Sequence, residues 1–198
     1  AYNAWQPGVF ALSGWDLVGM LTVPADEVAD LLGAGDTRWI ERGAHDLLDA
    51  DPTATRSASG MPRGRALYGA LPAQLDDPES FASRLSGILD LRREHGIATA
   101  SQVDIPEVAH AGMLVLVHRL DEGDPHADAA MQVTVLNFSP EPTEGTVRSE
   151  QLVPRSEVYD AASGETIGRV DDLQSFSVSL PGYGAKFLVL RAPEPLED

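Results

Sequence analysis

The sequence has no cysteine, and only Lys186 among its 14 basic residues is a lysine. Without cysteine there is no disulfide framework and no thiolate chemistry. The 31 acidic residues give a net charge of −17, which excludes the electrostatic footprint of proteins that bind nucleic acids or anionic membranes. No apolar run approaches the roughly 20 residues of a membrane span. We expect a cytoplasmic protein with a neutral ligand, without a nucleic-acid or membrane partner.

An apolar stretch, Val9 to Gly14, lies between Pro7-Gly8 and Trp15-Asp16. Six apolar and small residues between turn signals predict a short strand buried on both faces, as in parallel sheets. Parallel neighbours require crossovers of a dozen or more residues, and only a few residues precede this stretch. We therefore expect the chain to be the end of something longer.

Helical signals follow in two places. Residues 24–33 begin with Pro24, carry acids in the first turn and end at a glycine, which predicts a short amphipathic helix. A stronger helix is predicted to start at Asp77 and Pro78 and to stop at Gly96. Its apolar face is Phe81, Leu85, Ile88 and Leu89, and Arg84, Arg92 and Arg93 are expected elsewhere. Residues 36–48 are predicted to be a functional loop, and residues 51–78 are predicted to be either a substrate-facing loop or a locally disordered segment.

From Ile97 onward the apolar pattern changes to a period of two. The candidate strands are Ser101–Ile105, Met113–Leu120, Met131–Ser139, Glu144–Leu152, Glu157–Asp160, Glu165–Val170, Ser175–Leu180 and Ala185–Arg191. Ser163-Gly164 and the run Pro181 to Gly184 are predicted hairpin turns. Short strands at near-regular spacing predict an antiparallel sandwich.

Four short segments in sequence order resemble the α-amylase superfamily, glycoside hydrolase family thirteen, and most of all its bacterial trehalose synthases, the maltose α-D-glucosyltransferases. They are the strand ending in Gly14-Trp15-Asp16, Gly35–Ala44, Ser59–Arg63 and Gly145–Glu150. The resemblance implies an α+β fragment. Residues 1–97 would be the end of a (β/α)8 TIM barrel, with strand eight, rim loops and helix eight, and residues 98–198 would be the C-terminal β-sandwich.

The implied activity is the isomerisation of maltose to trehalose by intramolecular α-glucosyl transfer through a covalent glucosyl-enzyme. Retaining transfer uses two carboxyl groups about 5–5.5 Å apart. In the superfamily these stand on barrel strands four and five, with a third on strand seven, so all would lie upstream of Ala1. The resemblance therefore implies no catalytic residue and no cofactor in this chain. Its partners would be the remainder of the barrel and maltose, trehalose or a related glucoside.

The resemblance implies that the chain contributes substrate-binding residues. Arg38 is placed like the arginine that, in related α-glucosidases and sucrose-processing enzymes, pairs with an aspartate and holds distal sugar hydroxyls. A guanidinium suits this role because it can grip a carboxylate and still offer donors. The alternative is an ion pair at the rim with Asp36 or Glu41.

Trp15 and Trp39 either stack on a sugar ring or pack as ordinary core or rim residues. Asp16 either bonds a substrate hydroxyl or bonds an adjacent loop; the superfamily usually has two acids here, whereas this chain has Trp-Asp-Leu. Arg63 and Arg65 are interpreted as solvated loop arginines, with a lid over the pocket as the alternative.

No metal site is expected, because the five histidines form no ligand pair at helical spacing with an acid. The acids Asp121, Glu122, Asp124 and Asp128 lack the spacing of a calcium loop and predict a solvated hairpin. Two alternative functions stay open. One is an amylosucrase-like or α-glucosidase-like enzyme of the same superfamily. The other is a non-catalytic β-sandwich module that stabilises a barrel or binds glucan.

Overall fold

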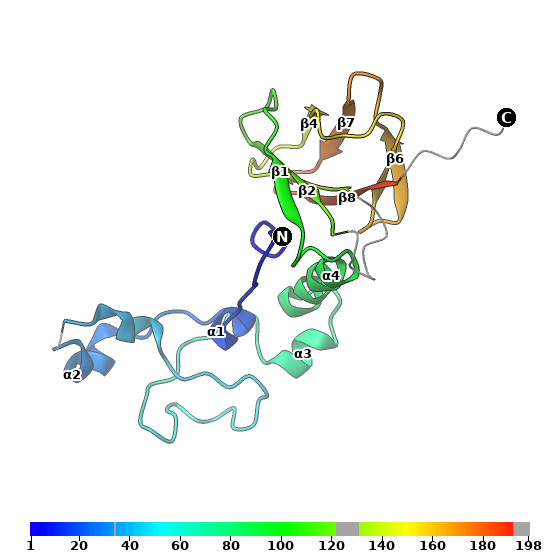
Figure 1. The fold of residues 1–198 in the computed structure, drawn as a ribbon. Helices are drawn as coiled ribbons and strands as arrows, with labels where there is room; N and C mark the ends of the chain where they lie inside the picture. The colour runs from blue at the N-terminus through cyan, green and yellow to red at the C-terminus, as the bar shows by residue number, and fades with distance from the viewer. Residues whose placement is uncertain (34, 122–130, 192–198) are drawn as a thin grey trace. The chain divides into compact units, whose positions relative to one another are not determined.

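The computed structural model describes residues 1–33, 35–121 and 131–191. The chain divides into two compact units, Ala1–Phe10 with Ile88–Asp198, and Ala11–Gly87 (Figure 1). These units follow contacts within the chain, so the predicted division of a barrel end (1–97) from a sandwich (98–198) stays a prediction. Glu122, Asp124 and Asp128 of the predicted acidic hairpin lie outside the described residues. In the described part of the chain, no helix is long and apolar enough to cross a membrane.

The first unit is an antiparallel β-sandwich. Its strands are β1 (Ser101–Asp104), β2 (Met113–Arg119), β3 (Met131–Asn137), β4 (Thr143–Arg148), β5 (Glu157–Asp160), β6 (Glu165–Arg169), β7 (Ser175–Leu180) and β8 (Ala185–Arg191). All eight predicted strands are confirmed. The largest difference is at β4, which ends at Arg148 rather than at Leu152.

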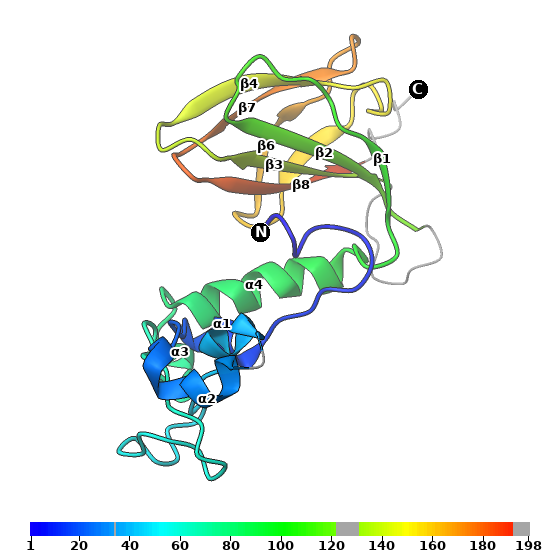
Figure 2. The same cartoon turned by 90° about the vertical axis from the view of Figure 1, so that its left-hand side faces the viewer.

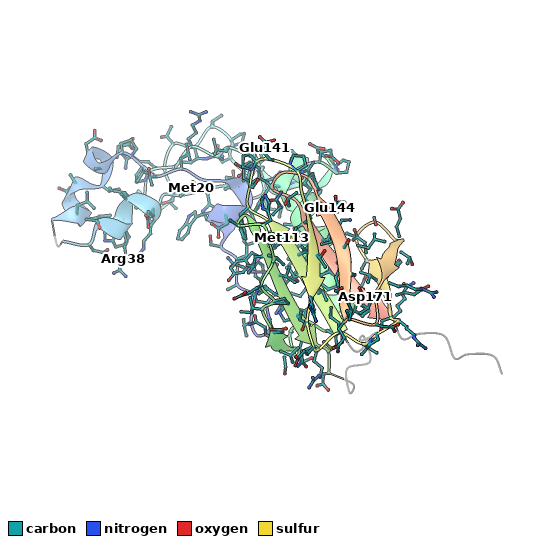
Figure 3. The ribbon with its side chains drawn as sticks, turned by 90° about the horizontal axis from the view of Figure 1, so that it is seen from above. Met20, Arg38, Met113, Glu141, Glu144 and Asp171 are labelled. Carbon is teal, nitrogen blue, oxygen red and sulfur yellow. The ribbon has the colours of Figure 1, made fainter. Side chains whose placement is uncertain are left out.

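One sheet has six strands in the order β1-β2-β3-β8-β5-β6, and the other contains β4 and β7 (Figure 2). Buried apolar side chains from both sheets form one cluster, which includes Val115, Val133, Val147, Val178 and Leu188. A Cβ at Gly145 in β4 would lie 3.1 Å from Met113 Sδ in β2, so the glycine permits close approach of the two sheets (Figure 3).

The two predicted hairpin turns have different outcomes. Ser163-Gly164 does connect the paired strands β5 and β6, with Gly164 at φ 77°. The run Pro181 to Gly184 is not a hairpin turn, because β7 pairs with β4 whereas β8 pairs with β3 and β5. The Asn137 side chain donates to Pro181 O at 3.0 Å, and Tyr183 takes a left-handed φ of 55°. This turn therefore carries the chain from one sheet to the other.

A second buried cluster includes Trp5, Ile97 and Phe187. The indole of Trp5 donates to Ile88 O at 3.1 Å, and its ring lies 5.2 Å from that of Phe187. Arg92 was expected away from the apolar helix face, and its burial was not predicted. Its guanidinium is buried and donates to the carbonyls of the first residues of the chain, Ala4, Gln6 and Gly8. The N-terminal carbonyls supply the acceptors that make this burial possible.

Helix α4 (Phe81–Glu94) confirms the strongest predicted helix, with a later start. Asp77 accepts a hydrogen bond from the Glu79 N–H at 2.9 Å and so stabilises a turn rather than the helix. The cap is Ser80, whose hydroxyl accepts from the Ser83 N–H at 3.1 Å. Gly96, at φ 60°, follows the helix end as predicted.

The second unit, residues 11–87, consists of short helices and loops. The helices are α1 (Gly14–Val18), the 3₁₀ helix η1 (Ala25–Val28), α2 (Ala29–Leu32), the 3₁₀ helix η2 (Thr37–Glu41) and α3 (Leu71–Leu75). The predicted helix over 24–33 is confirmed as η1 followed by α2. The predicted loop over 51–78 is irregular up to α3, with an isolated bridge between Arg56 and Pro62.

The predicted buried strand from Val9 to Gly14 is wrong. Residues 9–13 are irregular, α1 begins at Gly14, and Val9 is 98% exposed. A strand requires a hydrogen-bonded neighbour, and in the described residues every strand of the two sheets lies between Ser101 and Arg191. The barrel part of the predicted fold is therefore not confirmed, whereas the antiparallel sandwich is.

Candidate functional site

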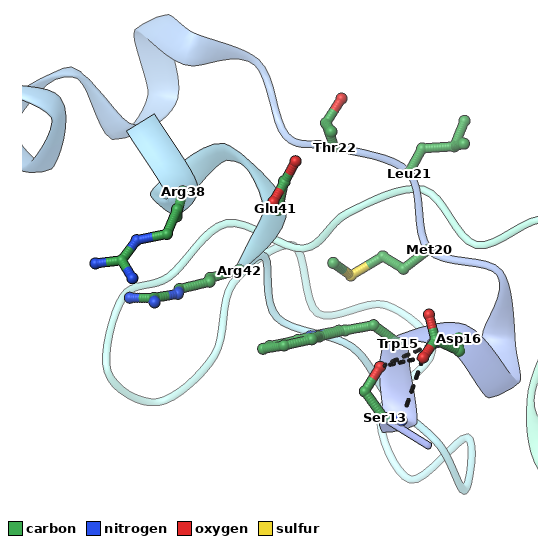
Figure 4. Close-up of a pocket in the computed structure, with 9 residues that line it drawn as sticks. All are labelled: Ser13, Trp15, Asp16, Met20, Leu21, Thr22, Arg38, Glu41 and Arg42. Atoms are coloured by element: carbon green, nitrogen blue, oxygen red, sulfur yellow. Dashed lines mark hydrogen bonds between the residues drawn. The ribbon is translucent and has the colours of Figure 1, made fainter. Parts of the chain in front are cut away.

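An open cleft of about 400 Å³ lies within residues 11–87. Its walls come from α1, the segment that follows α1, and η2 (Figure 4). It is lined by Ser13, Trp15, Asp16, Met20, Leu21, Thr22, Arg38, Glu41 and Arg42. Three of the four predicted substrate-binding residues, Trp15, Asp16 and Arg38, thus line one cleft.

Helix α1 begins with a capping box. The Asp16 N–H donates to Ser13 Oγ at 3.3 Å, and Asp16 Oδ2 accepts from the Ser13 N–H at 3.2 Å and from its hydroxyl at 2.8 Å. The pattern Ser-x-x-Asp predicts this arrangement, and sequence reasoning missed it. Asp16 therefore holds the start of α1 with one carboxylate oxygen. Its predicted contact with a substrate hydroxyl stays a prediction.

Trp15 is fixed at the cleft wall by two contacts. Its indole N–H donates to Gly43 O at 2.9 Å, and its ring meets the His45 ring edge-on, with centroids 5.8 Å apart. The side chain is half-buried. Because the N–H is satisfied within the chain, the part of the ring that lines the cleft offers apolar surface.

Arg38 and Asp36 form a bidentate ion pair. Arg38 Nε lies 2.7 Å from Asp36 Oδ1, and Nη2 lies 2.9 Å from Oδ2. Asp36 also caps η2 by accepting from the Arg38 backbone N–H at 3.1 Å. The hydrogen bond from Arg38 lowers the pKa of Asp36 to about 2, so this carboxylate is charged near neutral pH.

The ion pair that was the alternative to sugar binding is therefore present. The ion pair does not use all five N–H donors of the Arg38 guanidinium. Asp36 occupies two, so Nη1 and the second Nη2 hydrogen stay available. The Arg38 side chain is 69% exposed and points away from the ribbon (Figure 3). Arg38 can hold a carboxylate and donate to another oxygen at the same time.

Trp39 is not among the lining residues of the cleft. Its ring lies under the guanidinium of Arg42, 5.1 Å from centroid to Cζ. Arg42, which sequence reasoning missed, does line the cleft. In a 3₁₀ helix the side chains at i and i+3 eclipse, so the spacing of Trp39 and Arg42 was the available signal.

The charges at the cleft are of mixed sign. Arg38 and Arg42 stand beside three carboxylates: Asp16, Asp36 and Glu41. Such a site does not favour an anion such as phosphate over a neutral ligand. It offers one aromatic wall and several directed donors, which suits a neutral polyhydroxyl compound. Among the described residues, no group of three His, Asp or Glu side chains could hold a metal ion.

The loop arginines have different roles. Arg63 is half-buried, and its Nη1 donates to Asp51 O at 2.9 Å and to Ala54 O at 3.4 Å. The interpretation of Arg63 as a solvated arginine is therefore wrong, because the carbonyls of its own loop accept its donors. Arg65 is exposed. Another arginine, Arg56, connects the loop to η1 through Glu27 at 3.4 Å.

No family model and no curated protein matches the sequence. Among solved structures, the chain is similar to a mutant of MutB in complex with the substrate sucrose, with 16% identity over 96% of this chain and 37% of that chain and a TM-score of 0.61. It also matches an α-amylase from Malbranchea cinnamomea, at 18% identity over 61% of this chain and 25% of that one, with a TM-score of 0.42. An Anoxybacillus α-amylase matches at 14% identity over 58% of this chain and 23% of that one, with a TM-score of 0.43.

These structural neighbours are α-amylase-superfamily glycoside hydrolases. The chain spans just over a third of MutB and about a quarter of the two α-amylases. At this level of identity, the likeness to MutB shows a shared fold. It extends over nearly all of the chain, so residues 11–87 as well as the sandwich have counterparts in that structure.

Proposed function

We propose that this chain is the C-terminal part of an α-amylase-superfamily enzyme that transfers a glucosyl unit, and that its reaction is the isomerisation of maltose to trehalose. The observation that carries the proposal is the cleft that brings Trp15 and Arg38 together. The fold match to a sucrose-bound enzyme, which covers 96% of the chain, also supports it. The choice of maltose and trehalose follows the expected resemblance of Gly35–Ala44 to trehalose synthases.

The cleft supplies two kinds of contact that a sugar needs. The Trp15 ring presents apolar surface on which the C–H face of a pyranose can stack. Arg38, held by both oxygens of Asp36, presents its remaining donors to sugar hydroxyls without first having to be ordered. Together these contacts bind a glucosyl unit and fix its orientation.

The bond-breaking groups of this mechanism belong to the remainder of the barrel. A nucleophilic carboxylate would displace glucose from maltose and form a β-glucosyl-enzyme, with an acid group protonating the leaving oxygen. The released glucose would rotate, and its anomeric hydroxyl would attack the glucosyl carbon. The former acid group would take the hydroxyl proton as the bond to the nucleophilic carboxylate breaks, and trehalose would form. Water that entered instead would cause hydrolysis. Asp36 is not suited to be the acid, because Arg38 keeps it ionised.

The test is an assay of the native protein on maltose, with trehalose measured by chromatography. Arg38→Ala should lower the turnover about 100-fold, since misplaced substrate costs rates of this order. The matched control is Arg84→Ala, because Arg84 is also exposed (65%) and paired with an acid, Glu79, yet does not line the cleft. Unchanged turnover in Arg38→Ala would contradict the role of the cleft.

The second candidate is an amylosucrase-like or α-glucosidase-like enzyme, which would turn over sucrose or hydrolyse maltose to glucose without forming trehalose. The sucrose complex of MutB favours it, because that structure matches nearly the whole chain. The same assay with sucrose separates the two candidates. If the native sample turns over neither sugar and contains only this 21.1 kDa chain, the non-catalytic module is the better proposal.

A further inference from the structure

Arg42 stands at the C-terminal end of η2, one turn after Trp39. Its backbone N–H donates to Trp39 O at 3.2 Å, which closes a 3₁₀-type turn. The eclipsed spacing brings the Arg42 guanidinium over the Trp39 indole at 5.1 Å. This side chain then extends along the cleft on the same side as Arg38 (Figure 4).

Asp36 makes an ion pair with Arg42 but no hydrogen bond. Arg38 already occupies both oxygens of Asp36, at 2.7 and 2.9 Å. Arg42 Nη1 lies 3.9 Å from Asp36 Oδ2, beyond hydrogen-bonding distance. The Arg42 guanidinium is therefore held by two described contacts, a long ion pair with Asp36 at 3.9 Å and the cation–π contact with the Trp39 ring at 5.1 Å, and Arg42 makes no side-chain hydrogen bond to Asp36. The cation–π contact leaves the in-plane donors of Arg42 available, because the indole touches only the face of the group.

We infer that Arg42 is a second sugar-binding guanidinium and that Trp39 is its positioning residue. This inference rests on the proposed function and deepens it. Two guanidinium groups beside one carboxylate, Asp36, present two sets of donors to one neutral glucoside. Sugar stacking was one of two alternatives for Trp39; this inference instead gives Trp39 an indirect role, in which its ring orients Arg42.

The experiment measures kcat and KM of the native enzyme on maltose for Trp39→Leu, Trp39→Phe and Arg42→Gln. Loss of the cation–π contact should raise KM about 2- to 5-fold, as its strength at exposed sites implies, with kcat and the thermal midpoint unchanged. Trp39→Phe retains an aromatic face and should restore most of the affinity. The double variant of Trp39→Leu and Arg42→Gln should be no worse than Arg42→Gln alone, because both changes remove the same interaction.

Three results would overturn the inference: additive effects in the double variant, wild-type KM in Arg42→Gln, or a lower thermal midpoint in Trp39→Leu with unchanged KM. Its failure is distinguishable from failure of the proposed function. If Arg38→Ala loses activity and the Trp39 and Arg42 variants do not, only this inference falls. If the wild-type enzyme acts on neither maltose nor sucrose, both proposals fall.

Discussion

The sandwich and residues 11–87 are built in different ways. The sandwich unit contains two clusters of buried apolar side chains. In residues 11–87 the buried apolar side chains are few: Val18, Val23, Val28 and Ala82. The same segment exposes Leu12, Leu21, Leu31, Leu48, Leu67, Tyr68, Leu75 and Phe81. The candidate cleft lies in the unit with the smaller core, so its geometry depends on local polar contacts rather than on burial.

Gln74 illustrates how residues 11–87 are held. It is buried, and its amide donates to Leu17 O at 2.8 Å and to Gly69 O at 3.0 Å. Its carbonyl accepts from the Ala82 N–H at 3.1 Å. One side chain thus joins α1, the loop before α3 and the start of α4. Directed hydrogen bonds of this kind set the shape of a segment that burial alone does not determine.

Replacing a leucine by alanine in each unit should give the largest difference in stability loss between the two units. Leu188 is 0% exposed in the sandwich, and Leu188→Ala should lower the free energy of unfolding by about 2–5 kcal/mol. Leu48 in the other unit is 68% exposed, and Leu48→Ala should change it by less than about 0.5 kcal/mol. Urea unfolding measures both. Equal losses would contradict the contrast between the units.

Gln74→Met tests the hydrogen bonds that the Gln74 side chain makes within residues 11–87. The variant keeps the volume but leaves the carbonyls of Leu17 and Gly69 without this donor, so stability should fall by about 1–3 kcal/mol. Gln102→Met, at an exposed position of β1, is the matched control and should be nearly neutral. Thermal unfolding of both variants is the measurement. A neutral Gln74→Met would show that packing, not this network, holds the segment.

The sandwich was predictable because its signals are local. Alternating apolar residues and a Ser-Gly turn are enough to predict strands and a hairpin. The partner of each strand depends on the whole chain, so the crossing between sheets at Pro181 to Gly184 was missed. Burial of Arg92 was also missed, because its acceptors lie more than 80 positions away in sequence. The periodicity of apolar residues predicts strands but does not predict which distant segments pair with each other.

Residues 11–87 were harder to predict. Val9 to Gly14 has the pattern of a buried strand, but that pattern does not say whether neighbouring strands exist. At the site, Arg38 was identified with Asp36 as one of two possible carboxylate partners, since Asp36 and Arg38 are only two positions apart in sequence. The partner of Trp39 was not identified, although a spacing of three residues in a 3₁₀ helix brings it to Arg42.

We expect the stability of the sandwich to depend on pH through His118. His118 is fully buried, its Nδ1 lies 2.7 Å from Gln132 Oε1, and its Nε2 has no hydrogen-bond partner among the described residues. Burial lowers the pKa of His118 below its ordinary value near 6.5. The unfolded chain therefore binds a proton that the folded chain does not. Neutral His118 therefore favours the folded state. Its contribution to the free energy of unfolding is fully present above pH 6.5 and is lost as the pH falls below that value.

Thermal midpoints between pH 8 and pH 5 measure this effect. His118→Gln is the control, because it keeps a donor for Gln132 and does not titrate. The wild-type midpoint should fall more steeply with acid than that of the variant. If the thermal midpoints of the wild type and of His118→Gln fell in parallel with pH, His118 would not contribute to the pH dependence of stability.

Hydrogen exchange of the native protein with and without maltose, followed by mass spectrometry, shows which of the two units binds the sugar. We expect maltose to slow exchange in peptides that cover residues 13–22 and 36–42, which contain the lining residues of the cleft, and to leave exchange in β3 and β8 of the sandwich unchanged. Protection confined to the sandwich, or no protection in the cleft peptides at saturating maltose, would contradict this expectation.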